Sequence, residues 1–250
     1  MARNKMIASG EDGMANLVRR LCDRHYGIGA DGVVFVGKGR TADFEMTMYN
    51  PDGSRGEMCG NGIRCAGKYV RDRGMTLKKQ FTIESMGAIK KMEALEETKE
   101  CSFFRVDMGR ALMRGELRYG TFEMTCVSMG NPHAVLFPKD WEGCEVERWG
   151  RGIETAPCFP NRTNVEFVKV QDRRHLLLRV WERGAGETLA CGTGACAAAA
   201  VCMQKGLTDD EITVTLLGGE LSVSAQKDTG HLMLAGPAVT VFKGNVEMGQ

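Results

Sequence analysis

Apolar residues recur at helical spacing in one segment near the start of the chain. Met14, Leu17, Val18 and Leu21 follow an i, i+3, i+4, i+7 pattern, which places them on one face of a helix. The pattern ends before Gly27, and a glycine commonly follows the last turn of a helix. We therefore predict an amphipathic helix from Met14 to about residue 26.

Short runs rich in β-branched and aromatic residues, bounded by turn-forming residues, predict strands along the rest of the chain. The predicted strands are Val33–Val36, Phe44–Tyr49, Phe81–Ser85, Phe103–Met108, Phe122–Ser128, Ala134–Phe137, Val165–Val170, Leu176–Trp181, Ile212–Leu217, Leu221–Ser224, Leu232–Ala235 and Val239–Phe242. Two further helices are predicted, one from Gly62 to Gly74 and an alanine-rich one from Thr193 to Lys205. Strands outnumber helices, so the predicted fold class is α+β.

The chain contains an internal repeat. The segment Cys59–Ala66 (CGNGIRCA) resembles Cys191–Ala197 (CGTGACA), and the two copies begin 132 residues apart. Each copy opens one of the predicted helices. Such a spacing indicates a duplicated structural unit. We predict two pseudo-symmetric lobes, each a mostly antiparallel sheet wrapped around a central helix. Residues 1–115 form the first lobe, which the returning segment 238–250 completes, and residues 116–237 form the second.

The charge balance excludes several classes of protein. The 250 residues carry 33 Lys+Arg and 32 Asp+Glu, a formal net charge of +1, so the chain lacks the basic field that nucleic-acid binding requires. Its longest uncharged stretch, Thr188–Gln204, contains glycines and is shorter than a membrane span. No apolar stretch of the secretory type follows the first basic residues. We expect a cytoplasmic protein with neither nucleic acid nor a membrane as partner.

Two of the ten cysteines stand out from the others. Cys59 and Cys191 each precede a Gly-x-Gly and a predicted helix, whose positive end can lower a thiol pKa from near 8.5 to roughly 3.5–7.5. The unpaired amides at such a helix end also bind anions such as a carboxylate. The remaining cysteines are expected to be packing residues, namely Cys22, Cys65, Cys101, Cys126, Cys144, Cys158, Cys196 and Cys202.

Metal and nucleotide binding are the rival uses of these motifs. Structural zinc sites show close ligand pairs such as C-x2-C, which do not occur here, and the four histidines are scattered. We expect no metal. The segment Gly27–Gly32 matches G-x-G-x-x-G but follows a helix and precedes a strand. This is the reverse of the dinucleotide-binding order, so it is interpreted as a turn.

Polar residues near the two cysteines suit an amino-acid substrate. Asn50, Asn131 and Asn164 lie in turns beside predicted strands, where turn chemistry alone also explains asparagine. Glu182 and Arg183 differ, because these charged residues end a strand and lead through glycines into Cys191. An ordinary surface salt bridge is the alternative interpretation of this pair.

Several segments together resemble diaminopimelate epimerase, a pyridoxal-independent amino-acid epimerase with two cysteines. They are Arg24–Gly32 (RHYGIGADG), Tyr49–Cys65 (YNPDGSRGEMCGNGIRC), Ser128–His133 (SMGNPH), Phe159–Phe167 (FPNRTNVEF) and Glu182–Ala197 (ERGAGETLACGTGACA). The resemblance implies the two-lobed fold, a cytoplasmic homodimer, and the interconversion of LL- and meso-2,6-diaminopimelate in lysine biosynthesis. It implies no metal and no cofactor.

The resemblance also implies roles for individual residues. Cys59 and Cys191 are expected to be the base and acid pair, with His133 and Glu182 as the residues that tune them. The expected contacts with the amino-acid substrate are Asn50, Gly60, Asn61, Asn131, Asn164, Glu182, Arg183, Gly192 and Thr193. Arg183 is expected to bind a carboxylate as a bidentate fork.

The chain departs from the family pattern at two places. The family begins with a strand and a His-Gly-x-Gly-Asn-Asp motif, which this sequence lacks, and Met1–Asn4 resembles the residues after that strand. We expect a chain short of roughly 15 residues, an uncovered sheet edge and weak activity. Phe242 stands where the family has a tyrosine at its dimer interface.

Two other functions stay open at this stage. A proline racemase-like isomerase would share the two cysteine motifs but take a cyclic substrate. An impaired, shortened homologue would only bind its ligand.

Overall fold

The structure is a computed structural model that describes residues 10–56 and 59–246. The chain divides into two compact units, Met1–Met92 and Glu93–Gln250. The lobe boundaries expected from the internal repeat, 1–115 with 238–250 and 116–237, are a different division and stay a prediction. The expectation about residues 1–4 lies outside the described residues.

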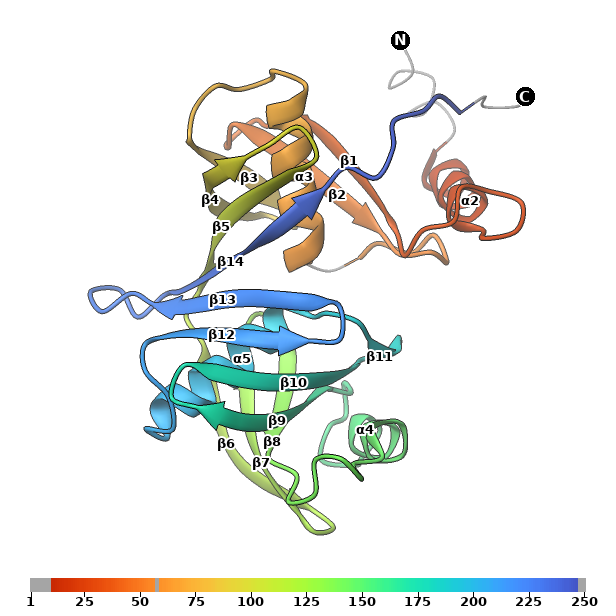
Figure 1. Cartoon of the computed structure of the whole chain (residues 1–250). Coiled ribbons are helices and arrows are strands. Elements are labelled where there is room, and N and C mark those ends of the chain that lie inside the picture. The colour runs from red at the N-terminus through yellow and green to blue at the C-terminus, as the bar shows by residue number, and fades with distance from the viewer. Residues whose placement is uncertain (1–9, 57–58, 247–250) are drawn as a thin grey trace. The chain divides into compact units, whose positions relative to one another are not determined.

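The first unit places two helices against a small sheet (Figure 1). Its elements are α2 (Gly10–Cys22), β1 (Val33–Lys38), β2 (Phe44–Tyr49), α3 (Gly60–Asp72), β3 (Gln80–Ser85) and the first half of β4 (Ala88–Glu97). The strands lie in the order β1-β2-β3-β4, and β2 and β3 are parallel because α3 connects them. The apolar face of α2 predicted above packs through Val18 and Cys22 against Tyr49.

The second unit is a larger, mixed sheet with two helices. Its further elements are β5 (Cys101–Gly109), β6 (Leu112–Tyr119), β7 (Phe122–Ser128), β8 (Pro132–Leu136), α4 (Val146–Glu154), β9 (Asn164–Asp172), β10 (His175–Glu182), β11 (Gly186–Thr188), α5 (Gly192–Gln204), β12 (Glu211–Leu216), β13 (Gly219–Ala225) and β14 (Leu232–Val239). The strand order is β5-β14-β13-β12-β10-β9-β8-β7-β6, with β11 paired to β10.

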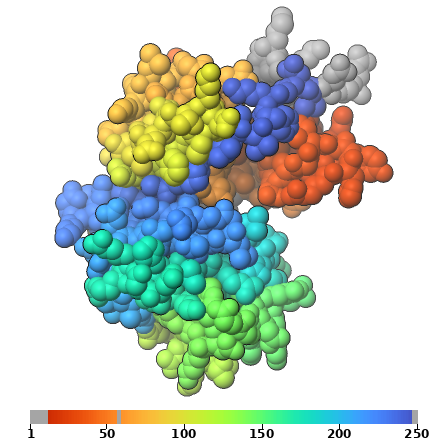
Figure 2. Space-filling view, viewed as in Figure 1, coloured from red at the N-terminus to blue at the C-terminus, as the bar shows by residue number. Residues whose placement is uncertain are grey.

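The central helix of the second unit is enclosed by strands. α5 contacts β7 to β10 and β12 to β14, and its residues from Gly192 to Cys202 are all buried. An alanine-rich sequence suits this position because small side chains let strands approach a helix from several sides. Figure 2 shows one face of this unit, on which teal residues of β9 and β10 and blue residues of β12 and β13 lie beside green residues from earlier in the chain.

The internal repeat corresponds to a repeated β-α-β arrangement. β2, α3 and β3 form one copy, in which β2 and β3 are parallel. β10, α5 and β12 form the other, in which β10 and β12 are parallel. Both helices have 13 residues and begin directly after a repeat cysteine. The mixed, sheet-dominated α+β fold that the sequence predicts is therefore confirmed.

Some elements differ from the predictions. β4 (Ala88–Glu97) and β6 (Leu112–Tyr119) were not expected as strands, because few of their side chains are buried. The predicted strands Leu232–Ala235 and Val239–Phe242 are wrong as separate elements, since β14 runs without interruption from Leu232 to Val239. Pro237 lies beyond the residues of β14 that pair with β13, so its missing N–H is tolerated there.

Candidate active site

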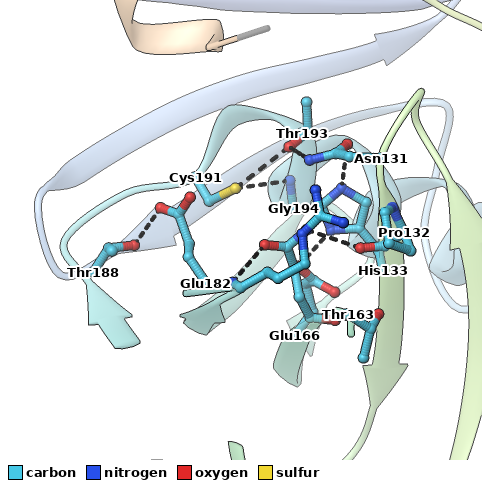
Figure 3. A network of polar contacts seen from close by, with 12 residues as sticks. Asn131, Pro132, His133, Thr163, Glu166, Glu182, Thr188, Cys191, Thr193 and Gly194 are labelled. Carbon is cyan, nitrogen blue, oxygen red and sulfur yellow. Dashed lines mark hydrogen bonds and ion pairs between the residues drawn. The ribbon is translucent and has the colours of Figure 1, made fainter. Parts of the chain in front are cut away.

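Cys191 caps the N-terminus of α5 with its thiol. It lies immediately before the helix in an extended conformation, and its Sγ accepts a hydrogen bond from the backbone N–H of Gly194 at 3.3 Å. The Thr193 hydroxyl lies 3.4 Å from the same sulfur (Figure 3). The sulfur thus occupies the place that a serine or aspartate oxygen takes in an ordinary helix cap.

The pKa of the Cys191 thiol is raised well above its ordinary value. Burial is the largest cause, followed by the charges of Glu182 and Glu166, while the hydrogen bonds from Thr193 and Gly194 oppose it. The prediction that the helix end lowers this pKa is therefore wrong for Cys191, because desolvation and two carboxylates outweigh the helix-end amides. In the substrate-free protein Cys191 is a protonated thiol, the form that can act as an acid.

Glu182 lies at the end of β10 and faces Cys191. Its Oε1 accepts a hydrogen bond from the Thr188 hydroxyl at 2.5 Å. Burial raises the pKa of Glu182, and hydrogen bonds from Thr188 and Cys191 partly offset that rise. β11 supplies Thr188 by folding back on β10. The predicted tuning residue is thus held by its own hairpin, within reach of the thiol.

His133 lies on β8 and is almost fully buried, with 1% of its surface exposed. Its Nδ1 is 2.7 Å from Glu166 Oε1, and its Nε2 is 2.9 Å from Asn131 Oδ1. The Asn131 amide donates to the Thr193 hydroxyl at 3.3 Å. His133 therefore reaches the Cys191 sulfur through Asn131 and Thr193 rather than directly (Figure 3).

Asn164 and Arg183 lie at neighbouring strand ends. The Asn164 side chain donates to the Pro132 carbonyl at 2.8 Å and accepts from the Arg183 backbone N–H at 2.9 Å. The Arg183 guanidinium donates to the Asn161 carbonyl at 3.2 Å, in an exposed position. Asn164 thus joins the start of β8 to the end of β10 and places Arg183 where a ligand carboxylate could meet it.

Glu154, at the end of α4, forms hydrogen bonds with residues at the end of β10. This buried carboxylate accepts hydrogen bonds from Trp181 Nε1 at 2.7 Å and from the Gly184 N–H at 2.9 Å. α4 can lie this close because a Cβ on Gly150 would fall 2.4 Å from Trp181 Cγ. The sequence did not predict α4, whose two internal glycines oppose a helix in isolation.

The first unit holds the other predicted thiol. Cys59 caps α3 as Cys191 caps α5, and its Sγ accepts the Gly62 N–H at 3.3 Å. Gly60 and Asn61 form the first turn of α3, where Asn61 Oδ1 accepts a hydrogen bond from Arg64. Asn50 follows β2 and donates to Ser54 Oγ at 3.0 Å.

The structure therefore groups the predicted residues by unit. It brings Asn131, His133, Asn164, Glu182, Arg183, Cys191, Gly192 and Thr193 to one end of the second unit. Cys59, Gly60, Asn61 and Asn50 lie in the first unit. Phe242 follows β14, and 65% of its surface is exposed.

No sequence motif points to two buried carboxylates near this site, Glu166 and Glu154. Glu166 gave a signal, because it is the one charged residue in the otherwise uncharged run Asn164–Val168 of a predicted buried strand. The prediction that eight cysteines are packing residues is wrong for Cys65 and Cys158, which are exposed. Cys65 lies within α3, and Cys158 lies in the turn after α4.

Two further observations concern the described part of the chain. Among residues 10–56 and 59–246, no group of three or more His, Cys, Asp or Glu side chains is placed to hold a metal ion. In the same residues, no helix is long and apolar enough to cross a membrane.

Comparison with known sequences matches most of the chain to one protein family. The family described as diaminopimelate epimerase matches residues 7–113 and 125–241. A diaminopimelate epimerase of Acetivibrio thermocellus is 43% identical over 253 residues, which cover 94% of this chain and 90% of the relative. Another, from Moorella thermoacetica, is 42% identical over 97% of this chain and 93% of the relative.

Solved structures share the fold at low sequence identity. A phenazine biosynthesis protein of the PhzF family from Bacillus anthracis has a TM-score of 0.71 at 17% identity, over 92% of this chain and 87% of that protein. A probable proline racemase from Agrobacterium radiobacter has a TM-score of 0.71 at 15% identity, over 96% and 83%. These likenesses establish the fold, and the sequence matches establish that the chain belongs to the diaminopimelate epimerase family.

Proposed function

We propose that this chain epimerises LL-2,6-diaminopimelate to meso-2,6-diaminopimelate, in lysine biosynthesis, by moving protons with two thiols. The observation that carries the proposal is the Cys191 thiol, which caps a helix beside Glu182 and ends a hydrogen-bond chain to His133. The relatives at 41–43% identity are diaminopimelate epimerases, which identifies the substrate.

Cys191, the thiol of the second unit, is suited to deliver a proton. Cys191 is protonated before substrate arrives, so its S–H bond can break as a C–H bond forms at the α-carbon. The resulting thiolate would then accept hydrogen bonds from the Gly194 N–H and the Thr193 hydroxyl. Preorganised donors of this kind stabilise developing negative charge without reorganisation.

Cys59, the thiol of the first unit, would exchange the proton on the other face of the same α-carbon. As a thiolate, Cys59 would take the α-proton, so that a C–H bond breaks and an S–H bond forms. In the opposite direction the two thiols exchange roles. The pair needs no metal and no cofactor in this scheme, because positioned acid and base groups each contribute about 10²- to 10⁴-fold.

The remaining predicted contacts would hold the amino-acid substrate in place during the proton transfers. The half-buried Arg183 would bind a carboxylate with its guanidinium, which donates to the Asn161 carbonyl. The amides that begin the helices, at Gly60 and Gly192, would face a carboxylate at a helix N-terminus. Asn50, Asn61, Asn131, Asn164, Glu182 and Thr193 are proposed as the further contacts.

Proton exchange with solvent tests this proposal. The protein is incubated with LL-diaminopimelate in D₂O under reducing conditions, and deuterium at the α-carbons is followed by NMR. We expect deuterium at one α-carbon together with formation of the meso isomer, and a loss of at least ~10³-fold in Cys59→Ala and in Cys191→Ala. Exchange with proline alone would overturn the substrate assignment in favour of a racemase. Binding without exchange would overturn the catalytic proposal.

We also propose a cytoplasmic homodimer with Phe242 at its interface. Val239, Val241 and Phe242 expose 57%, 89% and 65% of their surfaces, and adjacent exposed apolar residues favour an interface. Light scattering after size-exclusion chromatography should give twice the chain mass for the wild type, and Phe242→Glu should shift it towards the monomer. An unchanged mass in that variant would remove Phe242 from the interface.

A further inference from the structure

Glu166 is a buried carboxylate that neither transfers a proton nor binds the substrate in the proposed mechanism. It lies on β9, none of its surface is exposed, and its Oε1 is 2.7 Å from His133 Nδ1. Its other oxygen, Oε2, is buried without a hydrogen-bond partner among the described residues. Burying a carboxylate costs free energy unless it is well compensated. Its place in an apolar strand therefore calls for an explanation.

The carboxylate lies directly under the first turn of α5. A Cβ added to Gly194 would fall 2.8 Å from Glu166 Oε1, so only glycine fits at this position without a shift. The same Gly194 donates its N–H to the Cys191 sulfur. The helix end, the carboxylate and the thiol are therefore packed as one assembly.

A chain of polar contacts leads from Glu166 to the Cys191 sulfur. The distances are 2.7 Å from Glu166 to His133, 2.9 Å from His133 to Asn131, 3.3 Å from Asn131 to Thr193 and 3.4 Å from Thr193 to Cys191. We call these five residues the Glu166–Cys191 chain (Figure 3). The charges that act on the Cys191 sulfur are those of Glu182 from β10 and of Glu166 from β9. The charge of His133 from β8 acts on Glu182.

The donors in the chain point toward the sulfur. Asn131 Oδ1 faces His133 Nε2 and its amide donates to the Thr193 oxygen. The Thr193 hydroxyl hydrogen is then left to donate to Cys191 Sγ. This direction requires a proton on Nε2, because an amide oxygen only accepts.

This direction of donation also fixes the number of protons shared by His133 and Glu166. With Nε2–H donating to Asn131, the contact between Nδ1 and Oε1 also needs one proton, which is either on His133 or on Glu166. The pair then has no net charge. If that proton leaves, Nδ1–H donates to the carboxylate and Nε2 becomes an acceptor. The Asn131 amide must then rotate, and the donors run away from the sulfur.

We propose that Glu166 is a positioning residue of the Cys191 thiol: it holds His133 in the orientation and protonation that make Asn131 and Thr193 donate toward the sulfur. The inference rests on the proposed function in taking Cys191 as the reacting thiol. It adds a control of that thiol by a residue that touches neither the sulfur nor the substrate.

Two substitutions separate position from charge. Glu166→Gln removes the charge but keeps the length, and its amide can donate to Nδ1 so that Nε2–H still faces Asn131. Glu166→Asp keeps the charge but withdraws the carboxylate from His133. We expect Glu166→Gln to retain kcat within about fivefold and Glu166→Asp to lose about 10- to 100-fold in kcat with little change in KM.

The deciding measurement is the alkylation rate of Cys191 by iodoacetamide between pH 6 and 10, from mass spectrometry of its peptide. We expect Glu166→Gln to keep or raise that rate at pH 8, and Glu166→Asp to lower it at least threefold. Cys59 in the same sample is the internal reference. Asp107→Asn, which removes the carboxylate of another histidine pair in this unit, that of Asp107 and His231, is the matched control.

Each outcome decides the proposal. Alkylation that is unchanged in Glu166→Asp and slowed in Glu166→Gln would mean that charge alone matters, and would overturn it. Equal rates in both variants would make Glu166 a packing residue. Should Glu166→Asp fail to fold by circular dichroism, a tenfold loss in Glu166→Gln overturns the proposal and retention supports it. The alkylation rates are measured without substrate, so an inactive protein would leave this test intact.

Discussion

The two thiol-capped helices share a backbone and differ in what surrounds them. Cys59 and Cys191 have φ,ψ values of −114°, 115° and −126°, 111°, and each sulfur accepts the N–H three residues on at 3.3 Å. Both helices also end at a glycine of positive φ, Gly74 at 63° and Gly206 at 69°. The N-terminal cap, the length and the C-terminal turn are thus repeated.

The side chains of the two helices have diverged. α3 carries the buried cationic residues Arg64 and Lys68, whereas the equivalent positions of α5 hold Cys196 and Ala200. Cys59 is partly exposed and Cys191 is buried. The comparison teaches that the cap positions a sulfur but does not decide its protonation, which burial and nearby carboxylates control at Cys191.

Among the changes that leave both thiols in place, the largest expected effect on this comparison comes from removing the carboxylate that faces the buried thiol. In Glu182→Gln, the pKa of Cys191 should fall because the charge of Glu182 raises it. The thiol would then begin to ionise at lower pH, so that less of it would be in the acid form, although burial, the largest cause of the raised pKa, remains. We expect kcat to fall about 10²-fold, and the midpoint of Cys191 alkylation to move to lower pH.

Glu187→Gln is the control for that variant. Glu187 belongs to the same hairpin but is paired with Arg179, so its loss should leave the alkylation midpoint unchanged. A higher alkylation midpoint in Glu182→Gln would mean that Glu182 lowers the pKa of Cys191. That result would contradict the role given to its charge, and the contrast between the two thiols would need another cause.

The third residue of each helix provides a matched pair of smaller effect. A Cβ on Gly194 would lie 2.8 Å from Glu166 Oε1, whereas on Gly62 its nearest contacts, Cys59 and Val34, are at 3.4 Å. Gly194→Ala should therefore lower the free energy of unfolding by about 1–3 kcal/mol. Gly62→Ala should be neutral, or stabilising by up to about 1 kcal/mol. Urea denaturation compares the two, and equal losses would contradict the packing difference.

The smallest expected effect is on how the free energy of unfolding changes with pH in the alkaline range. Burial raises the pKa of Cys202 in α5 to about 12, from an ordinary 9.0, and α3 has Val70 at the equivalent position. Above about pH 9 the unfolded chain releases this proton while the folded chain keeps it, so stability falls as pH rises. The slope is about 1.4 kcal/mol per pH unit for one such group.

Cys202→Val tests that slope by giving α5 the side chain type of α3. Urea unfolding of the wild type and the variant at pH 8 and pH 10 should show a steeper loss in the wild type, by up to about 1.4 kcal/mol. Identical losses in the two proteins would mean that Cys202 ionises in the folded state as it does in the unfolded one.

The sequence predicts the repeated parts of this molecule best. Cys59, Cys191 and their helices were predicted because cap, glycine and apolar spacing are all local. β4 was missed because its residues, rich in Ala, Lys, Glu and Leu, favour a helix in isolation, and only pairing with other strands overrides that preference. α4 was missed because its packing against Trp181 through Gly150 is a tertiary feature.

The same limit applies to the site. Motif positions located Glu182, His133 and Asn131, but the sign of the pKa shift at Cys191 depends on burial and on Glu166, which lies 25 residues away in the chain. A local pattern carries no information about desolvation. The position of the thiol at the start of α5 was therefore predictable, and the direction of its pKa shift was not.

The pairing of β5 with β14 sets an order of events during synthesis. Cys101–Gly109 pair with Leu232–Val239, and β13 pairs with the same final strand. These ladder bonds cannot form until residues 232–239 have left the ribosome. Such distant contacts slow folding, and unpaired strand edges invite association with other chains. A nascent chain stopped before Leu232 would expose the edges of β5 and β13, so the emergence of β14 is the step that covers both edges.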